Sequence, residues 1–254
     1  MIAEFPQSLL LVFLVFCRIG GCVVLAPGLG SNRVPMRFRL FLAIAVSLSV
    51  FPLLVEGLRA GFQAYSTDHT AILILTELLT GLVVGLGGRC FVLAAQFAGT
   101  FIANVIGLAG VPGVSIDDSE ASTPLNSLIS LGVTWTMLSA GLHVGVLRAI
   151  VRSYETLPIG WEWDSLWLAR VFVEVLASTT LLALQLVSPF IIYSLAVNIA
   201  IGIMGRFVPQ LQVTALFTGV VLVLGFYLLL LLFPLLAGSF AAEYGNWLEG
   251  GVPE

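Results

Sequence analysis

The stretch AILILTELLTGLVVGLGGRCFVLAAQFAGTFIANVIGLAG, from Ala71 to Gly110, decides the fold class of this chain. Only Glu77 and Arg89 are charged within it. A helix needs roughly 20 mainly apolar residues to cross a bilayer, and the run lacks the two-residue alternation of a membrane β-strand. The stretch therefore predicts membrane-embedded helix rather than the core of a soluble domain.

Further apolar blocks surround this run on both sides. They lie at Ser8 to Ala26, Leu40 to Val55, Leu125 to Leu147, Val171 to Gly205 and Leu211 to Ala242. Together the six blocks predict an all-α, polytopic integral membrane protein, with residues 1–254 forming a single membrane domain. The three longest blocks exceed one crossing, and we expect kinked helices or buried hairpins where they break, at Gly85 to Arg89, Pro189 and Pro234.

The composition agrees with a membrane protein and excludes several functions. Hydrophobic residues make up 59% of the chain and charged residues 9%, with a mean hydropathy of +1.09, whereas soluble domains carry roughly 25% charged residues. All ten basic residues are arginine, which excludes P-loop and Schiff-base lysines. Because the net charge is −4 and no basic stripe exists, nucleic acid is not an expected partner.

The residues that usually carry catalysis or metal binding are sparse. Cys17, Cys22 and Cys90 lie in apolar surroundings, so we interpret them as packing residues. His69 and His143 are too few for a typical histidine-based metal site. The sequence also lacks a G-x-S-x-G elbow and an intramembrane pair of aspartates. We therefore expect no catalytic residue, metal or cofactor, and a protein that is not an enzyme.

Small residues recur at every fourth position in the long central run, a spacing that lets helix backbones approach closely in membranes. These candidate packing residues are Gly81, Gly85, Ala95, Gly99 and Ala103, with Gly107 continuing the spacing. The pattern predicts tight helix packing, with a partner helix either in the same chain or in another subunit.

Several polar groups interrupt the apolar blocks, and each is costly in lipid unless it is paired or faces water. They are Arg18, Glu77, Arg89, His143, Glu174, Gln185 and Asn198. One interpretation is an ion or proton relay through Glu77, Glu174 and His143. The other, which we favour, is structural pairing of Arg18 or Arg89 with one of the glutamates.

The charged loops give an expected topology. Arginines at 33, 37 and 39 and at 148 and 152 predict two cytoplasmic loops, which places the N-terminus outside. The acidic connector GLAGVPGVSIDDSEASTP, from Gly107 to Pro124, then lies outside if the third block crosses twice. A glycine-rich acidic connector is usually a solvated turn, but its place between two long apolar blocks also suits a pore.

Three segments resemble the FliR family of flagellar biosynthesis proteins. They are PGLGSNRVPMRFRLFLAIAVSLSVFP from Pro27 to Pro52, GLHVGVLRAIVRSYETLPIG from Gly141 to Gly160, and NIAIGIMGRFVPQLQV from Asn198 to Val213. The matching positions include Pro27, Pro35, Arg39, His143, Ser153, Pro158, Gly160, Arg206, Pro209 and Gln210.

The resemblance implies a subunit of the type III export gate in the bacterial inner membrane, within the flagellar basal body. There it would form, with FliP-like and FliQ-like subunits and a FlhB-like switch protein, the pore for unfolded rod, hook and filament proteins. Virulence secretion systems contain an equivalent subunit, which stays open as an alternative. A small proton-coupled transporter with Glu77 and Glu174 as carriers is a further alternative, but no internal repeat supports it.

The resemblance also implies that the segment from Gly107 to Pro124 is a pore plug. Its candidate residues are Gly107, Gly110, Val111, Pro112, Gly113, Val114, Ile116, Asp117 and Asp118. Glycine would supply backbone freedom, and Val111, Val114 and Ile116 could seal a narrow ring by apolar contact. The Asp117-Asp118 step replaces an Asp-Pro step of many relatives, so we expect a less rigid loop here.

Overall fold

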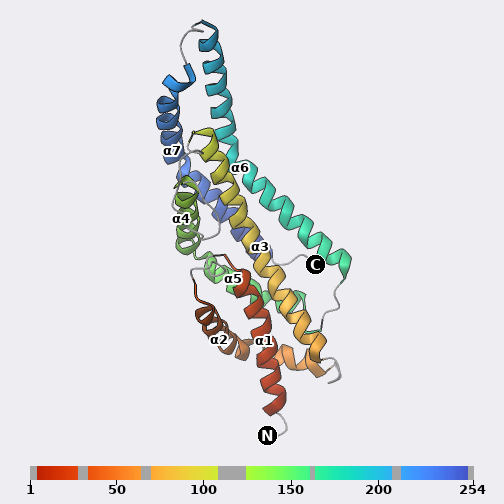
Figure 1. Cartoon of the computed structure of the whole chain (residues 1–254). Coiled ribbons are helices and arrows are strands. Elements are labelled where there is room, and N and C mark those ends of the chain that lie inside the picture. Colours follow the sequence, from red (N-terminus) through yellow and green to blue (C-terminus); the bar gives the residue numbers. More distant parts are fainter. Residues whose placement is uncertain are drawn as a thin grey trace. The chain divides into compact units, whose positions relative to one another are not determined.

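The described part of the chain is built from helices (Figure 1). The computed structural model describes residues 5–27, 34–63, 70–107, 124–160, 164–207 and 213–250, and all regular secondary structure in these ranges is α-helical. The helices are α1 Phe5–Leu25, α2 Met36–Gln63, α3 Thr70–Val105, α4 Pro124–Ser139, α5 Leu142–Thr156, α6 Ser165–Phe207 and α7 Val213–Gly250. The all-α prediction is therefore confirmed.

Five of these helices are long and apolar enough to cross a membrane. Their candidate spans are Ser8–Leu25, Met36–Arg59, Thr70–Val105, Leu166–Phe207 and Phe217–Gly250. The fourth predicted block forms two helices, α4 and α5, which pass the same test only when they are taken together as a pair. These spans confirm a polytopic membrane protein.

The expected break within the third block does not occur, because α3 continues through residues 85–89 as one 36-residue helix. The glycines that suggested a break are packing positions instead. A Cβ on Gly85 would lie 2.7 Å from the Cys22 carbonyl oxygen, and one on Gly88 would lie 2.9 Å from the Tyr244 hydroxyl oxygen. The block therefore does not cross twice as a hairpin, which was the condition attached to the predicted position of the acidic loop.

The other two expected breaks also lie inside continuous helices. Pro189 is within α6 and Pro234 is within α7. Proline removes one backbone hydrogen bond, which membrane helices tolerate when neighbouring groups satisfy the freed carbonyl. The interruption occurs instead at Gly141, whose φ of +69° separates α4 from α5. A positive φ is easily adopted only by glycine, so the sequence encodes the end of the helix at that position.

The contacts divide the chain into two compact units. Unit 1 contains Met1–Cys90, Gly141–Ala177 and Tyr244–Glu254, and unit 2 contains Phe91–Ala140 and Ser178–Glu243. Each of the helices α3, α6 and α7 has one part in unit 1 and its other part in unit 2. Each unit is described below by itself.

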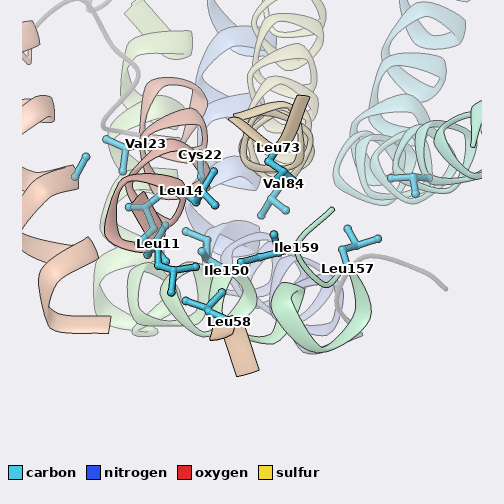
Figure 2. Packing of buried hydrophobic residues seen from close by; sticks show 14 of the residues in the cluster. Leu11, Leu14, Cys22, Val23, Leu58, Leu73, Val84, Ile150, Leu157 and Ile159 are labelled. Carbon is cyan, nitrogen blue, oxygen red and sulfur yellow. The ribbon is translucent and has the colours of Figure 1, made fainter. Parts of the chain in front are cut away.

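The core of unit 1 brings together side chains from α1, α2, α3, α5 and the start of α6. Figure 2 shows Leu11 and Leu14 of α1 near Leu58 of α2 and Ile150 of α5. Leu157 and Ile159 join this core from the segment that follows α5. Unit 1 therefore packs the first helices of the chain against a segment more than a hundred residues later.

A hydrophobic cluster of unit 2 lies between α3, α6 and α7. It contains Ile102 and Ala103 of α3 and Ile106 directly after that helix, together with Phe190 of α6 and Leu229 of α7. Ala103, Ile106 and Phe190 have no exposed surface. This cluster holds the point at which α3 ends and the acidic loop begins.

Candidate functional site

A buried ion pair joins α1 to α3 in unit 1. Arg18 Nε donates to Glu77 Oε2 at 2.7 Å, and Arg18 Nη2 donates to Glu77 Oε1 at 2.9 Å. Both residues are 1% exposed. Two parallel hydrogen bonds of this kind are the geometry in which an arginine and a carboxylate interact most strongly.

The same guanidinium also binds the end of α5. Arg18 Nη1 donates to Ser153 Oγ at 3.1 Å, and Nη2 donates to the Leu157 carbonyl oxygen at 3.0 Å. Ser153 Oγ in turn donates to the Ile150 carbonyl oxygen at 2.6 Å. The Tyr154 ring lies over the guanidinium, with its centroid 3.8 Å from Cζ. One arginine therefore connects three helices, which we call the Arg18 cluster: Arg18, Glu77, Ser153, Tyr154 and Leu157.

The Arg18 cluster decides between the two interpretations of the buried polar groups. Both oxygens of Glu77 accept hydrogen bonds from Arg18, whereas Glu174 and His143 are exposed on the surface of unit 1. The structure thus confirms that Arg18 pairs with Glu77, as the structural interpretation expected. Among the described residues, no three His, Cys, Asp or Glu side chains gather as a metal site.

Sequence reasoning did not find Tyr154 and Leu157 as partners of Arg18. Ser153, which entered only through the family resemblance, is 135 positions from Arg18, and Leu157 is 139 positions away. Helix periodicity relates residues three or four positions apart, so it carries no signal for such contacts. Only the packing of α5 against α1 brings these groups together.

The predicted small-residue positions in the first half of α3 face α1. A Cβ on Gly81 would overlap the Arg18 carbonyl oxygen, and one on Gly85 would lie 2.7 Å from that of Cys22. From the other side, a Cβ on Gly21 would lie 2.6 Å from the Leu78 carbonyl oxygen. Gly21 was not among the predicted positions, although the adjacent Gly20 and Gly21 are a visible signal. The two backbones approach as closely as in small-residue membrane contacts.

The later small residues of α3 lie in unit 2. Ala95 and Ala103 are buried, and a Cβ on Gly99 would lie 2.8 Å from Ile129 Cδ1 of α4. At Gly99 the neighbour is therefore a side chain of the same chain. Gly107 is exposed with a φ of +84°, at the end of the helical turn.

Most residues of the predicted plug lie outside the described ranges. These are Gly110, Val111, Pro112, Gly113, Val114, Ile116, Asp117 and Asp118. The family-signature residues Pro209 and Gln210 also lie outside them.

The described signature residues lie at the ends of helices. The Pro35 carbonyl oxygen accepts from the N–H groups of Phe38 at 2.9 Å and Arg39 at 3.3 Å, which starts α2. Gly160 is buried with a φ of +78° in the turn after α5. The remaining described positions are Pro27 after α1, His143 in α5, Pro158 after α5 and Arg206 in the last turn of α6.

Large apolar side chains cover the exposed surfaces of α2, α6 and α7. An 18-residue apolar stretch of α2 is only 11% buried within the chain, and the corresponding stretches of α6 and α7 are 17% and 11% buried. Examples are Phe41 at 70% exposed, Ile192 at 70% and Val223 at 67%. Surfaces of this kind require lipid or further protein subunits to cover them.

Comparison with known proteins identifies the family. The model of a family described as bacterial export proteins, family 1, matches residues 9–247. The flagellar biosynthetic protein FliR of Caulobacter vibrioides is 29% identical over 237 residues, 93% of this chain and 93% of the relative. FliR of Escherichia coli is 25% identical over 230 residues, 89% of this chain and 85% of the relative. The Yop proteins translocation protein T of Yersinia pestis is 23% identical over 221 residues, 85% of this chain and 83% of the relative. The chain, with its apolar helices and its match over nearly the whole length, therefore belongs to the bacterial export protein family 1.

Proposed function

We propose that this chain is a membrane subunit of the flagellar type III protein export gate. The observation that carries this function is the family match over residues 9–247, together with FliR relatives aligned over most of both chains. The gate would translocate unfolded rod, hook and filament proteins across the bacterial inner membrane. In this role the chain is part of a conduit and performs no catalytic step.

The proposed partners are FliP-like and FliQ-like gate subunits and a FlhB-like switch protein. The exposed apolar surfaces of α2, α6 and α7 support an assembly, because a monomer would leave them to lipid alone. A helix rises about 1.5 Å per residue, so the 43 residues of α6 extend about 65 Å. This length exceeds twice the roughly 30 Å hydrocarbon thickness of a bilayer, which favours protein neighbours along part of α6.

The proposed gating element is the segment from Gly107 to Pro124, acting as a plug in the pore. Its support is the family resemblance, the small and apolar residues of its sequence, and its position between α3 and α4. We also propose that residues 1–254 act as one membrane domain. The continuity of α3, α6 and α7 through both units supports that proposal.

A second candidate function is the equivalent gate subunit of a virulence secretion system. The similarity to the Yersinia pestis translocation protein T favours it. The FliR relatives from Caulobacter vibrioides and Escherichia coli are more similar to this chain, at 29% and 25% identity against 23%. The flagellar function is therefore the better supported of the two.

Co-purification from the native host tests the proposal. A tagged chain expressed from its own operon is extracted in mild detergent, and its bound proteins are identified by mass spectrometry. Recovery of FliP-like and FliQ-like subunits with flagellar companions is the expected result. Recovery with virulence-system companions would support the second candidate. A well-behaved monomer or homodimer would contradict both and favour a transporter.

A further inference from the structure

Arg89 is an exposed charge in the middle of a candidate membrane helix. It lies 19 residues after Thr70 and 16 residues before Val105, the two ends of α3. At a rise of about 1.5 Å per residue, these ends are about 28 and 24 Å away along the helix axis. Every other exposed arginine in the described ranges lies within six residues of a helix end. Arg89 is therefore too far along its helix for the side chain to reach either end.

The surface of α3 that leads to Arg89 is apolar. Leu75, Leu78 and Leu86 precede Arg89 by 14, 11 and 3 residues, a spacing that places all four on one face of the helix. The three leucines are 55%, 38% and 41% exposed. We call this group the Arg89 face: Leu75, Leu78, Leu86 and Arg89, all of which belong to unit 1. The face is thus an apolar stripe that carries one full charge.

The charge of Arg89 is permanent and needs an anion from elsewhere. A guanidinium stays protonated in proteins, so a change of protonation cannot remove its charge. No ion pair or side-chain hydrogen bond joins Arg89 to another residue that the structure describes. A charge within a membrane segment is costly unless it is paired or faces water. Because the rest of its face is apolar, pairing suits Arg89 better than a water-filled space.

Arg18 shows how this chain satisfies an arginine in apolar surroundings. Its partner is the carboxylate of Glu77 on another helix, which accepts two parallel hydrogen bonds. The two arginines belong to the same unit and both lie within candidate membrane spans. A carboxylate on a neighbouring helix is therefore the first anion to consider for Arg89.

A lipid phosphate is the other anion that a membrane offers. With Arg89 at the headgroups, either about 28 Å of α3 before it or about 24 Å after it would lie outside the hydrocarbon. The residues before it expose three leucines, and the 16 residues from Cys90 to Val105 carry no charge. Either position would leave an apolar half of α3 outside the lipid, so the observations favour a carboxylate supplied by protein.

We propose that the Arg89 face binds an apolar helix of a neighbouring gate subunit, and that this helix carries an aspartate or glutamate opposite Arg89. The leucines pack against the helix, and the guanidinium donates to the carboxylate. Exclusion of water strengthens such a charged hydrogen bond. This inference rests on the proposed function, because it requires a neighbouring subunit.

The first test replaces Leu86 with a photo-cross-linking amino acid in the gate complex of the native membrane. Leu86 is one turn from Arg89, and its side chain is exposed. Mass spectrometry of the cross-linked peptides identifies what covers the face. We expect an apolar segment of another subunit with an aspartate or glutamate within two turns of the linked residue. Cross-links chiefly to lipid, to this same chain or to a segment without a carboxylate would overturn the inference.

The second test is Arg89→Gln, with the fraction of the chain in the co-purified complex as the readout. Truncating one partner of a buried, hydrogen-bonded charge pair is expensive, so we expect the assembled fraction to fall at least about tenfold. The control is Arg148→Gln in α5, which removes an exposed charge and should leave assembly unchanged. Arginine in place of the identified carboxylate should restore assembly to Arg89→Glu.

The outcomes separate this inference from the proposed function. Normal assembly of Arg89→Gln, while the wild-type chain still recovers its gate subunits, would overturn the role of the Arg89 face and leave the export-gate function intact. A wild-type chain that purifies without other subunits would instead overturn the export-gate function, and the inference with it.

Discussion

Arg18 of α1 and Glu77 of α3, 59 positions apart in the chain, form an ion pair with two hydrogen bonds, at 2.7 and 2.9 Å. The pair is buried, and Arg18 also donates hydrogen bonds to Ser153 Oγ and to the Leu157 carbonyl oxygen. Moving two charges out of water is expensive, and such a pair is stable only when its geometry and additional hydrogen bonds compensate. The Arg18 cluster meets both conditions and connects α1, α3 and α5.

Glu77→Gln should strongly destabilise unit 1, because Arg18 would remain buried without a negative partner. Breaking a buried pair on one side typically costs roughly 3–5 kcal/mol. The thermal midpoint and yield of the purified complex measure the effect. The control is Arg148→Gln, since Arg148 is exposed. A double variant, Arg18→Met with Glu77→Met, should recover part of the loss, and a midpoint equal to that of wild type in Glu77→Gln would contradict the role given to the pair.

Gly81→Ala should loosen the contact between α1 and α3. The new methyl group would overlap the Arg18 carbonyl oxygen, and backbone atoms cannot move aside as a side chain can. Overpacking of this kind costs about 1–3 kcal/mol or more. The yield of folded protein after detergent extraction is the measurement. Gly57→Ala in α2 is the control, because a Cβ there meets nothing within 4 Å. Equal yields for the two variants would show that α1 and α3 tolerate separation.

Gly99→Leu should reduce assembly by displacing α4. Gly99 approaches Ile129, so a branched side chain would push α3 and α4 apart within unit 2. Native mass measurement of the co-purified complex gives the fraction assembled. Because the obstacle is a side chain, Ile129→Ala should restore part of the assembly in the Gly99→Leu background. If Ile129→Ala does not restore assembly although the Gly99→Leu chain folds normally, Gly99 contacts another subunit instead of α4.

Deletion of Val111 to Ile116 should leave the complex assembled and raise its leakage of small solutes. The reason is that the proposed seal is made by apolar side chains of that segment. Dye release from reconstituted vesicles measures the change. The control replaces Asp117 and Asp118 with asparagines, which preserves loop length and the apolar residues. Unchanged leakage in an assembled deletion complex would falsify the plug.

The helical and membrane-spanning character of the apolar blocks could be predicted from the sequence, because hydropathy is a local property of the chain. Long apolar runs with few charges predict membrane helices regardless of what surrounds them. The predicted break in α3 was wrong, because it was inferred from local glycine content alone. Glycine has a local cost in a helix, but Gly85 and Gly88 are compensated by neighbours that only the folded chain supplies.

The sequence by itself determined the fold class and the family, and it showed that Arg18 and Glu77 are charged groups within apolar blocks. It could not name the partner of Arg18, because two glutamates and several helices were compatible with pairing. Tertiary structure decided that Glu77 and the end of α5 meet Arg18, and that Ile106 fits against Gly225. The physical reason is that hydropathy and helix period depend on neighbouring residues, whereas these contacts depend on how whole helices pack.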